Sequence, residues 1–184
     1  MHRKKILSLL SDYRERYPKE MEVVERMTQF VSDNSDCFER SLQIGHITGS
    51  AWVVSPDFSE TLMTHHKKLN IWIQLGGHAD GDSDVSNVAM REAVEESGID
   101  DIKLVSDQIF DIDVHEIPAF GEEPAHYHYD VRFLLQTAHK DFKVSKESKA
   151  LAWISSSQLG KYSEEESILR MQRKWMSLAG KISN

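Results

Sequence analysis

Apolar side chains recur at helical spacing near the start of the chain, in residues 3–16 and again in about residues 19–32. The Asp-Asn-Ser-Asp cluster at 33–36 is typical of a loop. We therefore expect an N-terminal helical extension over residues 1–36, built as a helical hairpin, that precedes a single domain over residues 37–184. The hairpin is interpreted as a packing cap or a homodimer contact, and the alternative is a wall that borders a binding site.

From Ile44 onwards the apolar pattern shortens towards a period of two, which is typical of strands. Two β-rich runs, 46–54 and 60–66, are separated by the turn signal Ser-Pro-Asp and predict a hairpin. The clearest alternation covers residues 126–137. The other expected elements are a short strand at 70–75, a helix at 85–97, strands within 102–117 and 149–159, and a helix at 164–179. This order of elements predicts an α/β fold with a mixed sheet between helices.

The strands expected within 102–117 and at 126–137 each have a polar and an apolar face. If they pair with His115 opposite His126, the two polar faces coincide. That register would gather six side chains: Asp111, Asp113, His115, His126, His128 and Asp130. Two imidazoles at i and i+2 on one strand face, such as His126 and His128, can also bind a metal ion.

The helix expected at 85–97 carries three carboxylates on one face. Glu92 and Glu96 are four residues apart, and Glu95 is three residues from Glu92. Arg91 can reach Glu95 at i+4 and relieve part of the repulsion, but a divalent cation would relieve more of it. Magnesium prefers such oxygen ligands, completed by water and by substrate phosphates. The alternative is an acidic helix face that is simply solvated.

Composition excludes some classes of partner. With 22 Lys and Arg against 30 Asp and Glu, the formal net charge is −8, which argues against binding to a nucleic acid duplex. A polyanionic ligand would then need metal ions as its local positive charge. The single cysteine, Cys37, cannot form an internal disulfide and fits the reducing cytoplasm. We expect no secretory signal and no membrane-spanning segment, because the apolar runs are too short.

Residues 77–99, GHADGDSDVSNVAMREAVEESGI, resemble the signature of the Nudix hydrolase family. This signature, the Nudix box, reads G-x5-E-x7-R-E-U-x-E-E-x-G-U, in which U is aliphatic. Its last nine positions align with REAVEESGI, which begins at Arg91, and its first glycine then falls on Gly77. The sequence departs from the box at two positions, because Ala93 is a weak aliphatic residue and Ser83 replaces the first box glutamate.

The resemblance implies a Nudix-type α/β/α sandwich with a mixed β-sheet, here preceded by the N-terminal helical hairpin. It also implies a metal-dependent hydrolase that cleaves a pyrophosphate bond in a nucleoside diphosphate linked to another moiety, by attack of water on phosphorus. The expected cofactor is Mg²⁺ or Mn²⁺, and the expected partner is a small nucleotide-like diphosphate substrate. Nothing in the sequence identifies that other moiety.

The resemblance further implies roles for individual residues. The residues expected to be catalytic are Arg91, Glu92, Glu95, Glu96, Glu122 and Glu123. The expected metal ligands are the carbonyl of Gly77 and the side chains of Glu92, Glu95 and Glu96. Apart from the resemblance, His78, His126 and His128 are candidates for a second, histidine-containing metal site, because imidazole nitrogens bind metal ions. In this family the general base comes from the box helix or from a downstream loop, so Glu122, Glu123 and neighbouring Glu116 are the loop candidates.

Three alternatives stay open for these residues. The histidines could line a substrate cleft or an exposed strand face instead of binding metal. A Nudix fold can also serve as a ligand-binding or sensor domain without catalysis, although that class would be expected to lose the box glutamates. Finally, the Gly-Gly-His triplet at 76–78 resembles the isopentenyl diphosphate isomerases, but their catalytic cysteine position is occupied here by Gly76.

Overall fold

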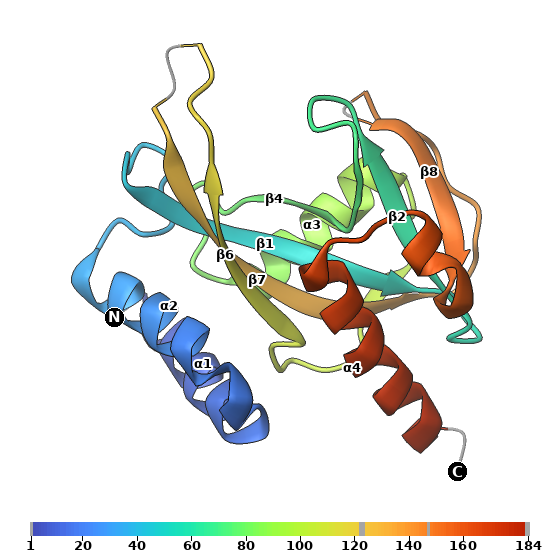
Figure 1. The fold of residues 1–184 in the computed structure, drawn as a ribbon, viewed down its shortest axis with the longest axis horizontal. Coiled ribbons are helices and arrows are strands. Elements are labelled where there is room, and N and C mark those ends of the chain that lie inside the picture. Colours follow the sequence, from blue (N-terminus) through green and yellow to red (C-terminus); the bar gives the residue numbers. More distant parts are fainter. Residues whose placement is uncertain (1, 122–123, 147, 183–184) are drawn as a thin grey trace.

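In the computed structural model, residues 2–121, 124–146 and 148–182 are described, and they fold around one eight-stranded sheet (Figure 1). The strands are β1 (Gly45–Val54), β2 (Glu60–His66), β3 (Trp72–Ile73), β4 (Leu75–His78), β5 (Ile102–Leu104), β6 (Asp111–Ile117), β7 (His126–Thr137) and β8 (Ser148–Ser155). The α-helices are α1 (Lys4–Arg16), α2 (Met21–Asp33), α3 (Val85–Ser97) and α4 (Glu166–Ile182). Two 3₁₀ helices, η1 (Pro18–Glu20) and η2 (Ser156–Lys161), complete the described elements.

The sheet is mixed because β1 and β7 run parallel at its centre, whereas the other pairs are antiparallel. Every residue of β1 is buried, which fits a strand that is covered on both faces. The expected hairpin of β1 and β2 pairs only beside its turn, at Val53 with Leu62 and Val54 with Thr61. Further along β1, residues 48–51 pair with β4 instead. The β2 strand continues away from β1 and pairs with β8 and β3.

Helices cover both faces of the sheet, as the expected sandwich requires. On one face, Val88, Ala89 and Ala93 of α3 join a hydrophobic core with alternate residues of β1 and β7. On the other face, Trp175 of α4 packs in a second core with Trp52 of β1. The α/β/α sandwich with a mixed sheet is therefore confirmed.

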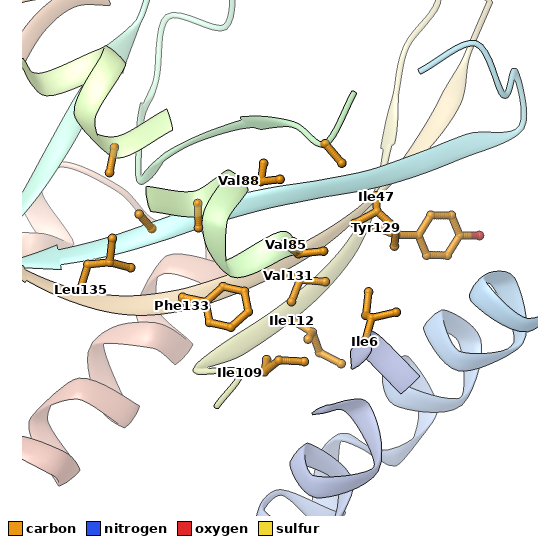
Figure 2. Close-up of a cluster of buried hydrophobic side chains, with 14 of the residues drawn as sticks. Ile6, Ile47, Val85, Val88, Ile109, Ile112, Tyr129, Val131, Phe133 and Leu135 are labelled. Carbon is orange, nitrogen blue, oxygen red and sulfur yellow. The ribbon is translucent and has the colours of Figure 1, made fainter. Parts of the chain in front are cut away.

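The N-terminal helices share the first of these cores with the sheet. Ile6 of α1 lies in the same cluster as Ile112 and Val131 (Figure 2). The ring of Phe30 in α2 stacks on Tyr129 of β7, with centroids 3.7 Å apart. The hairpin is thus a packing cap on the domain, and its expected roles as a dimer contact or a substrate-selecting wall stay predictions. No helix in the described ranges is both long enough and apolar enough to span a bilayer.

The register of β6 and β7 differs from the expected one. His115 lies opposite His128, and Ile117 lies opposite His126. Because the pairing moves by two residues, each side chain keeps its face, and the two polar faces still coincide. The neighbours change, however, and Asp113 comes to lie opposite Asp130.

Helix α3 ends where the sequence indicates, at a left-handed Gly98 with φ of +66°. We expect Gly98→Ala to lower the free energy of unfolding by about 1–2 kcal/mol, because a Cβ is strained in this conformation. Gly160→Ala is the matched control, since no described residue has an atom within 4 Å of the added Cβ and the backbone φ is not positive. Urea unfolding of both variants tests this, and equal stabilities would contradict it.

Candidate functional site

Gly76 and Gly77 both lie inside strand β4, just beyond the short strand expected at residues 70–75. Gly76 pairs with Ser50 of β1, and Gly77 pairs with Gly49. A Cβ on Gly77 would lie 2.4 Å from Oε2 of Glu92, and one on Gly76 would lie 2.3 Å from Oγ of Ser50. Glycine at both positions therefore allows β4 to sit tightly between β1 and the carboxylates of α3.

Two of the three box glutamates are directed at this glycine backbone. The amide of Gly76 donates a 3.0 Å hydrogen bond to Oε2 of Glu96, whose side chain is buried. Glu92 lies against Gly77 with 18% of its side chain exposed, whereas Glu95 is exposed. The helix face that carries the three carboxylates is thus turned towards β4, and Glu95 lies at the edge of that face, where it is exposed to solvent.

Arg91 contacts Glu92 and not the expected Glu95. Its Nη2 donates 2.9 Å hydrogen bonds to Oε1 of Glu92 and to the carbonyl oxygen of His78. The hydrogen bond to Glu92 raises the pKa of the Arg91 guanidinium. Arg91 therefore links α3 to the end of β4. Ser83, which the resemblance aligns with the first box glutamate, lies beside Lys5 of α1.

A group of three imidazoles lies at the end of the same strand. The nitrogens of His46, His78 and His128 that could hold a metal ion all lie within 4.8 Å of one another. His46 is on β1, directly opposite His128 on β7, and His78 is on β4 opposite Thr48. Two of the predicted histidine ligands, His78 and His128, thus come together with His46, which the sequence interpretation missed.

The third predicted histidine, His126, is a neighbour of this group and not a member of it. Its ring centroid lies 5.0 Å from that of His46 and 5.2 Å from that of His128. Its Nδ1 is 2.9 Å from the carbonyl oxygen of Pro124. His115 of β6 also flanks His128, with centroids 5.6 Å apart, and its Nδ1 is 3.0 Å from Asp113. Five imidazoles therefore occupy one end of the polar sheet face.

Burial and crowding keep two of these rings uncharged. Desolvation, followed by the influence of His78, lowers the pKa of His128 to about 2 and that of His46 to about 4. The nearby backbone of Leu42 raises the pKa of His46 and so offsets part of this lowering. Even so, no described residue has hydrogen-bonding geometry to either ring nitrogen of His46 or to Nε2 of His128.

Next to the imidazoles, the same sheet face carries a buried carboxylate with complete hydrogen bonding. Asp130 accepts hydrogen bonds from Thr48 at 2.9 Å and Ser50 at 2.7 Å. Nε of Arg132 donates to its other oxygen at 2.7 Å. The polar face thus continues from the histidines through Asp130 to Arg132, and ends at the hydrophobic core under α4.

Arg132 also belongs to an ionic network that fastens α4 to the sheet. Asp111, with 0% of its side chain exposed, accepts hydrogen bonds from Arg132 at 3.0 Å and from Lys174 at 2.6 Å. Two nitrogens of Arg170 donate to the same carboxylate at 2.8 and 2.9 Å. The expected gathering of Asp111, Asp113 and Asp130 on one face is therefore real, but cations from β7 and α4 occupy it.

Of the three loop candidates for the general base, only Glu116 lies within the described residues. Glu122 and Glu123 lie outside the described residues. Glu116 is the exposed residue opposite Tyr127 near the end of β6. The role of the loop between β6 and β7 therefore stays a prediction.

Comparisons with known proteins identify the architecture. No protein-family model and no curated protein matches the sequence. Among solved structures, a C. elegans Ap4A hydrolase in a binary complex matches with a TM-score of 0.55 at 18% identity, covering 73% of this chain and 98% of its own. A NUDIX-family hydrolase from Clostridium perfringens matches with a TM-score of 0.55 at 22% identity, covering 72% and 97%.

A third solved structure is an E. coli dihydroneopterin triphosphate pyrophosphohydrolase. It matches with a TM-score of 0.55 at 14% identity, and the match covers 71% of this chain and 95% of that one. Identities this low establish the fold alone. The described elements, the sheet order and these three likenesses together show that the chain has the fold of the Nudix hydrolases.

Proposed function

We propose that the chain is a metal-dependent hydrolase that cleaves a pyrophosphate bond in a nucleoside diphosphate linked to another moiety. The observation that carries this proposal is the meeting of α3 and β4, where Glu92 and Glu96 both face the backbone of Gly76 and Gly77. The fold supports it, because the similar solved structures are named as hydrolases of phosphoric anhydrides. The substrate itself would be small and anionic.

The residues at this junction suit Mg²⁺ or Mn²⁺. Glu92, Glu95 and Glu96 with the carbonyl of Gly77 form a set of hard oxygen donors, which these ions prefer. When bound, such an ion neutralises phosphate charge and makes water a better nucleophile. The carboxylate of Glu92 is fixed by Arg91 and that of Glu96 by the Gly76 amide, so both are positioned before an ion arrives.

The remaining chemistry requires a base that removes a proton from the attacking water. Glu122 and Glu123, in the loop between β6 and β7, are the proposed candidates, with Glu116 as the alternative. The N–H groups and guanidinium around Glu92 and Glu96 already hold those carboxylates as acceptors, so they are better suited to binding cations than to accepting protons.

A panel of nucleoside diphosphate derivatives tests the proposed activity. We expect phosphate-containing products from at least one member of the panel in the presence of Mg²⁺ or Mn²⁺, and none after chelation by EDTA. Binding of a panel member without any turnover would favour the non-catalytic sensor function. Turnover that continues unchanged in EDTA would contradict the role of the metal.

The structure disfavours the isomerase alternative. Cys37, the single cysteine, is fully buried in the core that contains α1 and α2. Burial raises the pKa of its thiol to about 11, so the nucleophilic thiolate is scarce at neutral pH. Cys37 is therefore a core residue, and the position before Gly77 that would carry a catalytic cysteine holds Gly76.

A further inference from the structure

The three imidazoles of His46, His78 and His128 are held by three neighbouring strands of the sheet. Each is on a different strand, and the three strands are adjacent because β4 and β7 both pair with β1. His46 and His128 occupy directly opposite positions of the parallel ladder. Backbone hydrogen bonding therefore fixes the spacing of the three rings without help from a loop.

Three ring nitrogens of His46 and His128 lack the hydrogen-bond partners that buried polar atoms normally have. His46 is only 3% exposed, yet neither of its ring nitrogens has the distance and angle of a hydrogen bond with any residue of the described ranges, although the backbone of Leu42 lies close enough to influence the ring. The same holds for Nε2 of His128. Buried polar atoms without partners are rare in folded proteins and usually indicate a bound water or ion. Here three such nitrogens occur on two neighbouring rings.

We propose that His46, His78 and His128 bind one divalent transition-metal ion, in a site separate from the carboxylates of α3. The two sites lie on opposite sides of β4. Gly77 pairs with Gly49 and faces α3, whereas the next residue, His78, pairs with Thr48 and faces the polar side of the sheet. This proposal does not depend on the hydrolase activity.

The ligand type selects the class of metal. Imidazole nitrogen suits Zn²⁺, Co²⁺, Fe²⁺ and related ions, whereas Mg²⁺ prefers oxygen. In a tetrahedral site with bonds of about 2.0–2.1 Å, ligand nitrogens are about 3.4 Å apart, so the present spread within 4.8 Å closes by small side-chain rotations. Three protein ligands also leave a coordination position open for water or an anion.

Charged side chains lie near the three rings, and each of them is paired with another charged or polar group. His115 flanks His128 and is hydrogen-bonded to Asp113, which in turn contacts Arg132 and so joins the ring to the ionic network. Arg40 is a cation that acts on His46, but its guanidinium is paired with Asp80 at 2.5 Å. Asp80 therefore offsets the charge of Arg40 beside His46.

Titration with Co²⁺ tests the site, because Co²⁺ replaces Zn²⁺ and its visible absorption reports coordination by nitrogen. The measurement uses the full chain, freed of metal by a chelator, in an excess of Mg²⁺ that saturates the carboxylates. We expect one Co²⁺ per chain with the intense absorption of a low-coordinate site. His46→Gln and His128→Gln should each weaken this binding at least ~100-fold.

Two control variants separate this site from binding at surface histidines and from binding at the carboxylates of α3. His139→Gln removes an exposed histidine outside the group and should bind Co²⁺ like the wild type. Glu96→Gln should also keep the Co²⁺ absorption, even though it is expected to lose hydrolysis, so failure of the proposed function leaves this result intact. His46 is buried, so His46→Gln could fail to fold. In that case the Co²⁺ affinities of His128→Gln and His78→Gln, which change half-buried side chains, test the site.

Metal binding by the wild-type chain tests the histidine site even without variants. No Co²⁺ absorption in the wild-type chain, together with no retained Zn²⁺ after dialysis, would overturn it. Equal Co²⁺ affinity in folded His128→Gln, His78→Gln and wild-type chains would overturn it as well. Displacement of Co²⁺ by millimolar Mg²⁺ would place the ion at the carboxylates and also contradict the histidine site.

Discussion

Replacing Glu96 by Gln is expected to lower kcat at least ~100-fold at saturating substrate, because a charge that stabilises the bound cation is lost. The amide oxygen of Gln can still accept the hydrogen bond from Gly76, so the junction of α3 and β4 should stay in place. The measurement is the rate of product formation over a range of Mg²⁺ concentrations. We expect the variant to need much more Mg²⁺ for any activity that remains.

The matched control is Glu15→Gln, which removes an exposed carboxylate from another helix, α1. It should leave both kcat and the Mg²⁺ dependence unchanged. Wild-type rates in Glu96→Gln with an unchanged Mg²⁺ dependence would show that Glu96 only fastens the helix to Gly76. A stability measurement on the same samples separates that outcome from partial unfolding.

Asp111→Asn is expected to lower the free energy of unfolding by about 3–5 kcal/mol, because it leaves buried cations without their shared anion. Three cations contact this carboxylate: Arg132, Arg170 and Lys174. Asp101→Asn is the control, since Asp101 is half-exposed and its pairing with Lys103 at 3.4 Å is a surface ion pair. Urea unfolding should show a large loss for the first variant and at most about 0.5 kcal/mol for the second.

The same network makes stability depend on acid. Burial by itself would raise the pKa of Asp111, but Arg170 and Arg132 more than offset it, so the pKa is lowered. Burial acts in the same direction on Asp113, whose pKa is lowered by its hydrogen bond to His115 and by Arg132. The unfolded chain therefore binds protons more readily than the folded chain below a pH of about 4. The stabilisation is present above that pH and is lost as the pH falls further.

We expect Asp111→Asn to flatten this acid dependence, because Asn does not titrate. Thermal unfolding of the wild type and the variant between pH 7 and pH 3 would show the difference in melting temperature shrinking as the pH falls. A constant difference over that range would show that Asp111 acts through packing and not through its charge.

Elements with strong local signals were predictable from the sequence. The bounds of α3 are those expected, because its periodicity ends at Gly98, which takes the left-handed conformation. The bounds of β7 also match, since polar and apolar residues alternate from His126 to Phe133. Pairing between elements was less predictable. The β1–β2 hairpin diverges after two residue pairs because β4 takes the place beside β1.

The residues of the candidate site show the same contrast between local sequence signals, which were predictable, and contacts between elements, which were not. The shared face of Glu92 and Glu96 follows from helical spacing alone, so the sequence indicated it before the structure did. His46 was missed because its importance depends on a parallel pairing with a distant strand, which alternation within one strand does not reveal. The polar residues His46, Thr48 and Ser50 do alternate in β1, and this pattern is the signal that could have marked the face.

The partners of Arg91 also could not be predicted from the sequence. Helical spacing allowed Arg91 to reach Glu95, but tertiary packing brought the carbonyl of His78 within reach instead. A guanidinium that bonds both a neighbouring carboxylate and a strand carbonyl gains more than one that makes a single exposed pair. Local geometry identified the donor, and the fold selected its partners.

The parallel ladder between β1 and β7 sets the order in which the molecule can assemble. Thr48 and Asp130, which meet across it, are 82 residues apart in the chain. Contacts so distant in sequence form late, because a long loop must close before they are made. During synthesis, β1 therefore leaves the ribosome well before β7 exists, and the apolar residues that it buries against later elements stay exposed in the interval.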